Sequence, residues 1–247
     1  MTTSQTGAAP TLAMLKNVAA CMALVEELRS RAPHLPGIGV FHGPSGYGKT
    51  YGTIYAQNKT RALRVEVGDS WTKRTLVQRI LDEAGVTPAG TISDMTKQVI
   101  MFLGDDPTRP LIVDEADQLV DRGMIEIIRE IHEHSQAPIL LVGEELLPQK
   151  LQRSERTHGR VLNWVAAQPA DVEDTRSLAT LFCRDIKVAD DLLDAIRTRS
   201  EGRPRRIVVN LNRAAEQARN SGLRAIDLKA HDGVFFTGAP PSRARAA

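Results

Sequence analysis

The sequence predicts a three-layer α/β domain with a mostly parallel sheet, followed by a small all-helical domain. Two observations predict this fold class. Up to Pro169, short apolar runs alternate with helical patterns of 11 residues or more, which is typical of βαβ units. After Pro169, apolar residues recur only at helical spacing. We therefore expect a domain boundary near residues 168–171.

The α/β part begins with a helix. Leu15, Val18 and Met22 recur at helical spacing, and Pro33 ends this helix near Arg31. Five short apolar runs, most of them bounded by glycine or proline, are predicted strands: 37–42, 63–67, 111–113, 139–142 and 161–165. The helical patterns between them include 50–57, 72–84, 92–103 and 118–134.

These elements divide the chain into four expected segments. Residues 1–10 are small and polar and predict a disordered leader. Residues 11–169 form the α/β core, and 170–230 form the helical domain. Residues 231–247 contain Gly233, Gly238 and a Pro240–Pro241 pair, so we expect a flexible tail.

Composition excludes several classes of protein. Charged residues make up 25% and hydrophobic residues 42% of the chain, so it is not wholly disordered. Only 4% of residues are aromatic, which argues against a protein that grips single strands by base stacking. Cys21 and Cys183 are too few for a disulfide framework. Without a signal peptide or a long apolar run, we expect a soluble cytoplasmic protein with no membrane partner.

One segment fits the phosphate-loop pattern G-x-x-x-x-G-K-[ST], between a predicted strand and a predicted helix. Its residues are Gly43, Pro44, Ser45, Gly46, Tyr47, Gly48, Lys49 and Thr50. Glycines allow successive backbone N–H groups to surround phosphate oxygens, and the helix N-terminus adds positive potential. Lys49 would reach the β- and γ-phosphates, and the Thr50 hydroxyl would bind Mg²⁺. The alternative is a glycine turn before a helix.

An acidic pair follows 65 residues after Lys49. The run Leu111-Ile112-Val113 leads into Asp114 and Glu115, at the carboxyl end of a predicted buried strand, where parallel sheets bind ligands. Asp114 would hold the metal through water, and Glu115 would act as general base on the attacking water. Such a pair also occurs at ordinary strand ends. Together with the phosphate loop, it predicts a protein that hydrolyses ATP or is switched by it.

These motifs, with arginines after the fourth strand and a Gly-x-Pro-Arg segment in the helical domain, resemble an AAA+ ATPase over residues 12–219. Residues 141–145 (LVGEE) and 202–206 (GRPRR) are similar to transposition ATPases of the phage Mu B-protein type. Secretion and replication-loading AAA+ proteins share these features in part. The sequence before the core is too short for the helix-turn-helix domain of the Mu B pattern, so the resemblance does not extend to that domain.

The resemblance implies further site residues around ATP and Mg²⁺. By position Glu144 would contact the γ-phosphate or the attacking water, although an amide is commoner there and a solvated helix start is the alternative. An arginine finger, which inserts into a neighbouring subunit's site, would be Arg160, with Arg156 and then Arg153 as the other candidates. Surface charge on a helix is the alternative for all three.

The helical domain would contribute one more arginine to the nucleotide. Arg205 follows Pro204 at a helix start, and its planar guanidinium suits a phosphate bridge. Arg206 and a simple capping role are the alternatives.

Charge indicates a possible DNA partner. Residues 196–229 hold 9 basic and 3 acidic residues, which suits binding to a phosphate backbone. The alternative is a helical domain that uses arginine only for solubility and for contact with the nucleotide. By resemblance to ring-forming ATPases, Trp71, Lys73 and Arg74 would face a channel and follow DNA. The alternative is a helix start with Trp71 packed on the core.

We therefore expect an AAA+ ATPase that binds double-stranded DNA without sequence preference when loaded with ATP. It would assemble with itself into a ring or filament, hydrolyse ATP slowly and present target DNA to a transposase. The alternatives are a helicase-loader or secretion-type ATPase acting on a protein partner, and an ATP-binding scaffold without significant hydrolysis.

Overall fold

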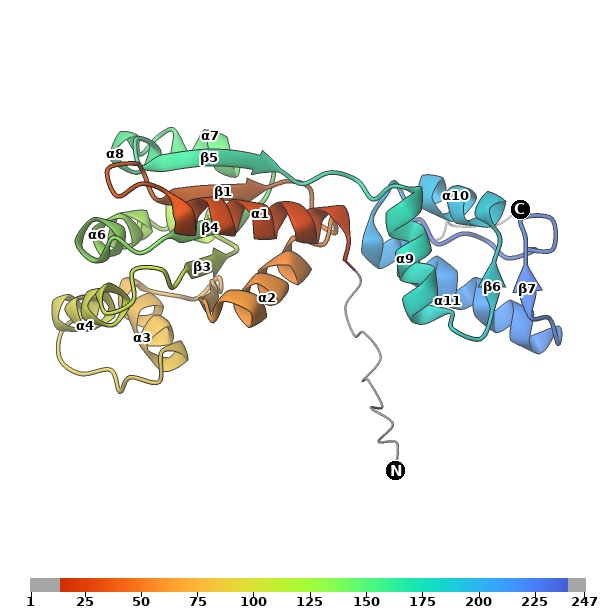
Figure 1. Ribbon diagram of the computed structural model, residues 1–247, viewed down its shortest axis with the longest axis horizontal. Coiled ribbons are helices and arrows are strands. Elements are labelled where there is room, and N and C mark those ends of the chain that lie inside the picture. The colour runs from red at the N-terminus through yellow and green to blue at the C-terminus, as the bar shows by residue number, and fades with distance from the viewer. Residues whose placement is uncertain (1–13, 240–247) are drawn as a thin grey trace, which may run out of the picture. The chain divides into compact units, whose positions relative to one another are not determined.

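The computed structural model describes residues 14–239 (Figure 1). The predicted leader, 1–10, and the last eight residues of the predicted tail lie outside the described residues. The chain divides into two compact units. The larger comprises residues 17–168, and the smaller comprises residues 169–239 with residues 14–16. None of the helices described here is both long and apolar enough to cross a membrane.

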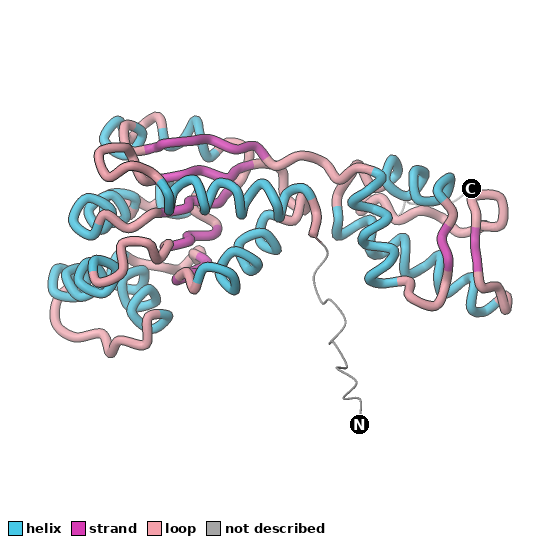
Figure 2. The backbone as a smooth tube through the Cα atoms, in the orientation of Figure 1, coloured by secondary structure: helices cyan, strands magenta, loops and turns pink. Residues whose placement is uncertain are grey.

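The larger unit contains a parallel sheet of five strands in the order β2-β3-β4-β1-β5 (Figure 2). The strands are β1 (Ile38–His42), β2 (Leu63–Glu66), β3 (Leu111–Asp114), β4 (Ile139–Gly143) and β5 (Val161–Ala166). All five predicted strands are confirmed to within two residues at each end. The parallel α/β fold class predicted from the alternating pattern is thereby confirmed.

Helices cover both faces of this sheet. They are α1 (Lys16–Ser30), α2 (Lys49–Thr60), α3 (Lys73–Glu83), α4 (Ile92–Gly104), α5 (Asp117–Asp121), α6 (Ile125–Ser135), α7 (Leu147–Leu151) and α8 (Glu155–His158). Successive strand residues point to opposite faces, so Val40 packs with α3, α4 and α6, whereas Phe41 packs with α1 and α2. This alternation makes two separate apolar cores and a three-layer unit.

The single helix predicted over residues 118–134 is wrong in one respect. It is broken into α5 and α6 by Gly123, which has a left-handed φ of 63°. The Met124 N–H donates to the Leu119 carbonyl at 2.7 Å, and the Gly123 N–H donates to the Val120 carbonyl at 3.1 Å. These two bonds close a glycine-type helix end. Apolar periodicity continues across the break, which is why the pattern did not reveal it.

The smaller unit contains α9 (Val172–Phe182), α10 (Asp190–Arg199) and α11 (Pro204–Asn220). It is not purely helical, because β6 (Lys187–Val188) and β7 (Ala225–Ile226) form a short parallel pair. Strands of two residues are too short to produce a visible alternation. Residues 231–239 lie against α11, where the buried Asn210 amide bonds both the N–H and the carbonyl of Phe236.

Close packing of α1 on α2 predicts the effect of one substitution. A Cβ added at Gly52 would lie 2.9 Å from the Cys21 Cβ, closer than such atoms approach. We expect Gly52→Ala to lower the free energy of unfolding by about 1–3 kcal/mol, as overpacking typically does. The control is Gly104→Ala on α4, where the added Cβ has no neighbour within 4 Å. Urea unfolding of both variants would contradict this packing if Gly52→Ala were as stable as Gly104→Ala.

Candidate functional site

The phosphate loop joins β1 to α2 at the carboxyl edge of the sheet (Figure 1). Gly46 and Gly48 have left-handed φ values of 86° and 82°, and Gly48 is the residue before the first turn of α2. Glycine adopts these angles without steric cost. The buried Asn17 side chain fastens the loop by donating to the Tyr47 carbonyl at 2.8 Å and the Gln168 carbonyl at 2.7 Å. The sequence therefore folds here into a turn that leads directly into a helix N-terminus.

The Lys49 ammonium group lies across this loop. It donates to the carbonyls of Gly43 at 2.6 Å and Pro44 at 3.0 Å. Burial lowers the pKa of Lys49, whereas the carboxylates of Glu115 and Asp114 act in the opposite direction. The cation is thus already positioned at the loop, where a phosphate could replace weak carbonyl partners with a charged one.

The acidic pair lies at the end of β3, two strands from β1 on the same edge of the sheet. Asp114 is 2% exposed, and Glu115 is exposed to solvent. Glu115 has a φ of 55°, an uncommon conformation for a residue other than glycine. Partial desolvation and the neighbouring Asp114 carboxylate raise the pKa of Glu115. The strand end therefore holds one carboxylate fixed and buried and turns the other outward.

Asp114 has two partners that the sequence did not reveal. Its Oδ2 accepts from the Arg64 guanidinium at 2.8 Å and lies 3.4 Å from the Thr53 hydroxyl. Arg64 lies on β2, the strand beside β3, and Thr53 lies one helical turn after Thr50 on α2. The position of Thr53 was a usable signal, because residues three apart share a helix face. The pairing with Arg64 required the order of the strands.

A second missed carboxylate supports the end of β4. Asp117 Oδ2 accepts from the Glu144 backbone N–H at 2.7 Å, and Asp117 Oδ1 lies 3.3 Å from the Lys150 Nζ. A Cβ on Gly143 would collide with Asp117 Oδ2, so a larger residue there would displace this carboxylate. Asp117 therefore fixes the backbone of Glu144, whose side chain is exposed.

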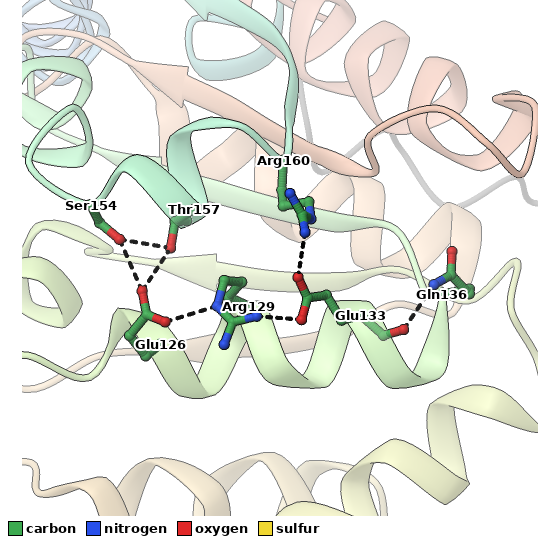
Figure 3. A network of polar contacts seen from close by, with 7 residues as sticks. All are labelled: Glu126, Arg129, Glu133, Gln136, Ser154, Thr157 and Arg160. Carbon is green, nitrogen blue, oxygen red and sulfur yellow. Dashed lines mark hydrogen bonds and ion pairs between the residues drawn. The ribbon is translucent and has the colours of Figure 1, made fainter.

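Arg160 lies at the opposite edge of the sheet, directly before β5 (Figure 3). Its guanidinium donates to Glu133 Oε1 on α6 at 2.7 Å. Figure 3 shows that Arg129 bridges Glu133 and Glu126, and that Ser154 and Thr157 also reach Glu126. The Arg160 side chain remains 46% exposed. This network holds Arg160 on the surface rather than burying it.

The remaining predicted arginines of the nucleotide site are on the surface. Arg153 and Arg156 are exposed beside α7 and α8, and Arg205 is exposed at the start of α11. Arg205 has no ion pair with any other described residue of its unit. These arginines are available to a ligand or partner.

The predicted DNA-binding segment lies at the carboxyl edge of the sheet. Trp71 follows β2, is partly buried and packs on the core between the sheet and α3. Lys73 and Arg74, on the first turn of α3, are exposed. The Thr72 hydroxyl begins this helix by accepting from the Thr75 N–H at 3.2 Å. Trp71 is thus part of the packing, and the two cations face solvent.

The residues present fit a magnesium–nucleotide complex. Thr50 is exposed at the start of α2, and among the described residues Asp114 Oδ1 accepts only the Glu115 N–H, at 3.2 Å. Proteins usually hold Mg²⁺ through one or two carboxylates together with substrate phosphates and water, rather than through a cage of protein ligands. Among the described residues, no group of three or more histidine, cysteine or acidic side chains is arranged so that it could hold a metal ion.

The fold is similar to those of known proteins. Residues 31–151 match the model of an AAA domain. No curated protein has significant sequence similarity to the chain. Similar solved structures include the ORC2 protein of Aeropyrum pernix in its ADP form (TM-score 0.65, 14% identity, covering 90% of this chain and 68% of that one).

Two further structures are similar. One is the A. pernix ORC1 protein in complex with DNA (TM-score 0.63, 15% identity, covering 90% of this chain and 64% of that one). The other is RuvB R170A of Thermotoga maritima (TM-score 0.58, 19% identity, covering 88% and 67%). The chain thus spans about two thirds of the length of these proteins. The finer resemblance to the Mu B-protein type stays a prediction. The match over residues 31–151 and the similarity to these structures show that the chain has the P-loop AAA+ fold.

Proposed function

We propose that the protein is an ATPase that binds double-stranded DNA without sequence preference when loaded with ATP, assembles with itself on that DNA, and presents it to a transposase. The observation that carries the nucleotide part is the convergence of Lys49, Asp114 and Glu115 at one edge of the parallel sheet. Two strand ends on the same side of the sheet, those of β1 and β3, bring together a phosphate-binding cation, a buried carboxylate and an exposed carboxylate.

The chain's own groups have distinct roles in hydrolysis. The N–H groups of the phosphate loop and the Lys49 ammonium bind the phosphates, and Thr50 with Asp114 would hold Mg²⁺. When bound, this ion neutralises phosphate charge. The exposed Glu115 carboxylate orients a water molecule and accepts its proton. Glu144, fixed by Asp117, lies at the neighbouring strand end, where it would contact that water rather than the like-charged phosphate.

Assembly would complete the site. Arg160 lies at the amino ends of the strands, so it would serve the nucleotide of a neighbouring protomer. Arg205, in the smaller unit, would contact the phosphates of the nucleotide bound to its own protomer. A neighbour held by the γ-phosphate loses that anchor after hydrolysis, and ATP therefore favours assembly whereas ADP weakens it.

Two features support DNA as the partner. Lys73 and Arg74 are exposed at the edge of the sheet that carries the phosphate loop, and the smaller unit carries the basic stretch 196–229. The A. pernix ORC1 protein, which shares this fold, is in complex with DNA. The proposal of a transposase partner rests on the resemblance of segments 141–145 and 202–206 to Mu B-type ATPases. A strand-transfer assay with a transposase encoded beside this gene would test this partner.

The DNA proposal is tested by fluorescence anisotropy with a random duplex at several salt concentrations. We expect binding with ATP and little binding without nucleotide. Lys73→Ala combined with Arg74→Ala should lower the slope of log affinity against log salt by about two per bound protomer, because two phosphate contacts are lost. Arg79→Ala with Lys97→Ala removes the same charge from α3 and α4 and is the control. Absence of ATP-dependent binding by the unmodified protein would refute DNA as the partner.

Lys49→Ala is expected to weaken ATP binding about 30-fold or more. Truncating one side of a hydrogen-bonded charge pair costs roughly 2–5 kcal/mol, and each 1.4 kcal/mol is tenfold in affinity. Titration with a fluorescent ATP analogue measures this loss. Lys59→Ala, on the exposed last turn of α2, is the control and should bind normally. Assembly on DNA that persisted in Lys49→Ala would instead favour a scaffold independent of nucleotide.

A further inference from the structure

Arg64 is a mostly buried cation beside the carboxylate that would hold a metal ion. Its side chain is 14% exposed, and its guanidinium lies 2.8 Å from Asp114 Oδ2. The same group also reaches Glu66, at 3.1 Å, but that carboxylate is 59% exposed. Solvent weakens the Glu66 contact, whereas the Asp114 contact lies in the protein interior. The stronger interaction of Arg64 is therefore with the predicted metal-binding residue.

The two carboxylate oxygens of Asp114 have different partners. Oδ2 faces Arg64 and Thr53, whereas within the described part of the chain Oδ1 accepts only the N–H of the next residue. Rotation of the carboxylate would break the contact with the guanidinium and leave a buried charge unpaired, which is costly. Arg64 therefore fixes the plane of the carboxylate and leaves Oδ1 available.

The same guanidinium also reaches the helix that carries Thr50. Arg64 Nε donates to the Thr53 hydroxyl at 2.8 Å, and that hydroxyl lies 2.8 Å from the Thr50 carbonyl oxygen, to which it donates. A continuous set of hydrogen bonds thus joins Asp114 on β3 to the first turn of α2. Both residues predicted to hold the metal are therefore connected through the side chains of Arg64 and Thr53.

We propose that Arg64 is a positioning residue for the divalent cation of the nucleotide site. It holds Asp114, and through Thr53 the turn that bears Thr50, in the arrangement that accepts Mg²⁺. This inference rests on the proposed binding of magnesium–ATP at the phosphate loop. Groups that orient a metal's ligands commonly matter nearly as much as the ligands themselves.

The test compares nucleotide binding with and without magnesium. A fluorescent ATP analogue is titrated with Mg²⁺ and, separately, bound in EDTA. Arg64→Gln should raise the Mg²⁺ concentration for half-saturation by about 10–100-fold, the usual effect of losing such a partner, and leave binding in EDTA unchanged. Arg64→Lys keeps the charge with poorer geometry, so its Mg²⁺ concentration for half-saturation should lie between those of the unmodified protein and Arg64→Gln. Glu66→Gln removes only the exposed partner of Arg64 and should match the unmodified protein.

An unchanged or lower Mg²⁺ requirement in Arg64→Gln would overturn the proposal. The arginine would then only neutralise the Asp114 carboxylate or repel the metal ion. If Arg64→Gln fails to fold, as circular dichroism would reveal, Thr53→Val breaks the same connection without removing the buried cation. Thr53→Val should also raise the Mg²⁺ requirement, and an unchanged value there would overturn the proposal. Failure of the unmodified protein to bind the analogue would instead refute the proposed nucleotide site.

Discussion

Replacing Arg160 by alanine is expected to lower ATP hydrolysis by the assembled protein about 10³–10⁵-fold, the usual contribution of an arginine finger. The phosphate loop follows the carboxyl end of β1, and Arg160 precedes the amino end of the adjacent parallel strand β5. Five residues of strand separate these edges by about 17 Å. By this spacing, the proposed finger Arg160 would serve the nucleotide of another protomer rather than that of its own.

Mixing variants tests this arrangement directly. Arg160→Ala keeps an intact phosphate loop, and Lys49→Ala keeps an intact Arg160, so each supplies what the other lacks. We expect phosphate release to be restored in the mixture above the level of either variant alone. Arg156→Ala and Arg153→Ala are the matched controls, because both arginines are exposed nearby. Normal hydrolysis by Arg160→Ala together with loss in Arg156→Ala would reassign the finger to Arg156.

Glu115→Gln is expected to lower hydrolysis about 10²–10⁴-fold, the range for loss of a general base. Glutamine keeps the size and hydrogen bonding of the side chain but cannot accept the proton. ATP affinity should be retained, and because ATP persists in the site, assemblies should be longer lived. Phosphate release and size-exclusion chromatography with ATP measure the two effects.

The control for Glu115→Gln is Glu130→Gln, an exposed position on α6 outside the polar network. That variant should hydrolyse ATP normally. If turnover by Glu115→Gln were also normal, another carboxylate would be the base, and Glu144 at the end of β4 would be the next residue to test.

The sequence predicted the parts of the fold that depend on local pattern. Successive residues of each strand face two different cores, which produces short apolar runs in the sequence. The phosphate loop needs glycines at fixed positions, so it too can be recognised from the sequence. The break at Gly123 left only a weak mark, because the apolar spacing on either side continues in phase. The β6–β7 pair was invisible, since its strands come from segments far apart in the chain and contain two residues each.

The candidate site could be predicted where its residues stand within local sequence motifs. Lys49 begins α2 after the phosphate loop, Asp114 and Glu115 lie at the end of β3, and all three belong to recognisable motifs. Arg64 and Asp117 act across strands, and their partners are set by the order of the sheet and by packing. Asn17 fastens the phosphate loop from α1, 30 residues before Tyr47. Such contacts bring together distant segments, and no spacing rule identifies them.

The opposite placement of the phosphate loop and Arg160 also determines how activity should scale with assembly. Two unlike edges that bind each other make a head-to-tail contact, which closes into a ring or continues as a polar filament. In an open filament one terminal protomer binds nucleotide without a neighbour's arginine, so completed sites are always one fewer than the protomers. Hydrolysis per protomer should therefore rise with filament length, and a filament should lose ATP along its length while its uncompleted end retains it.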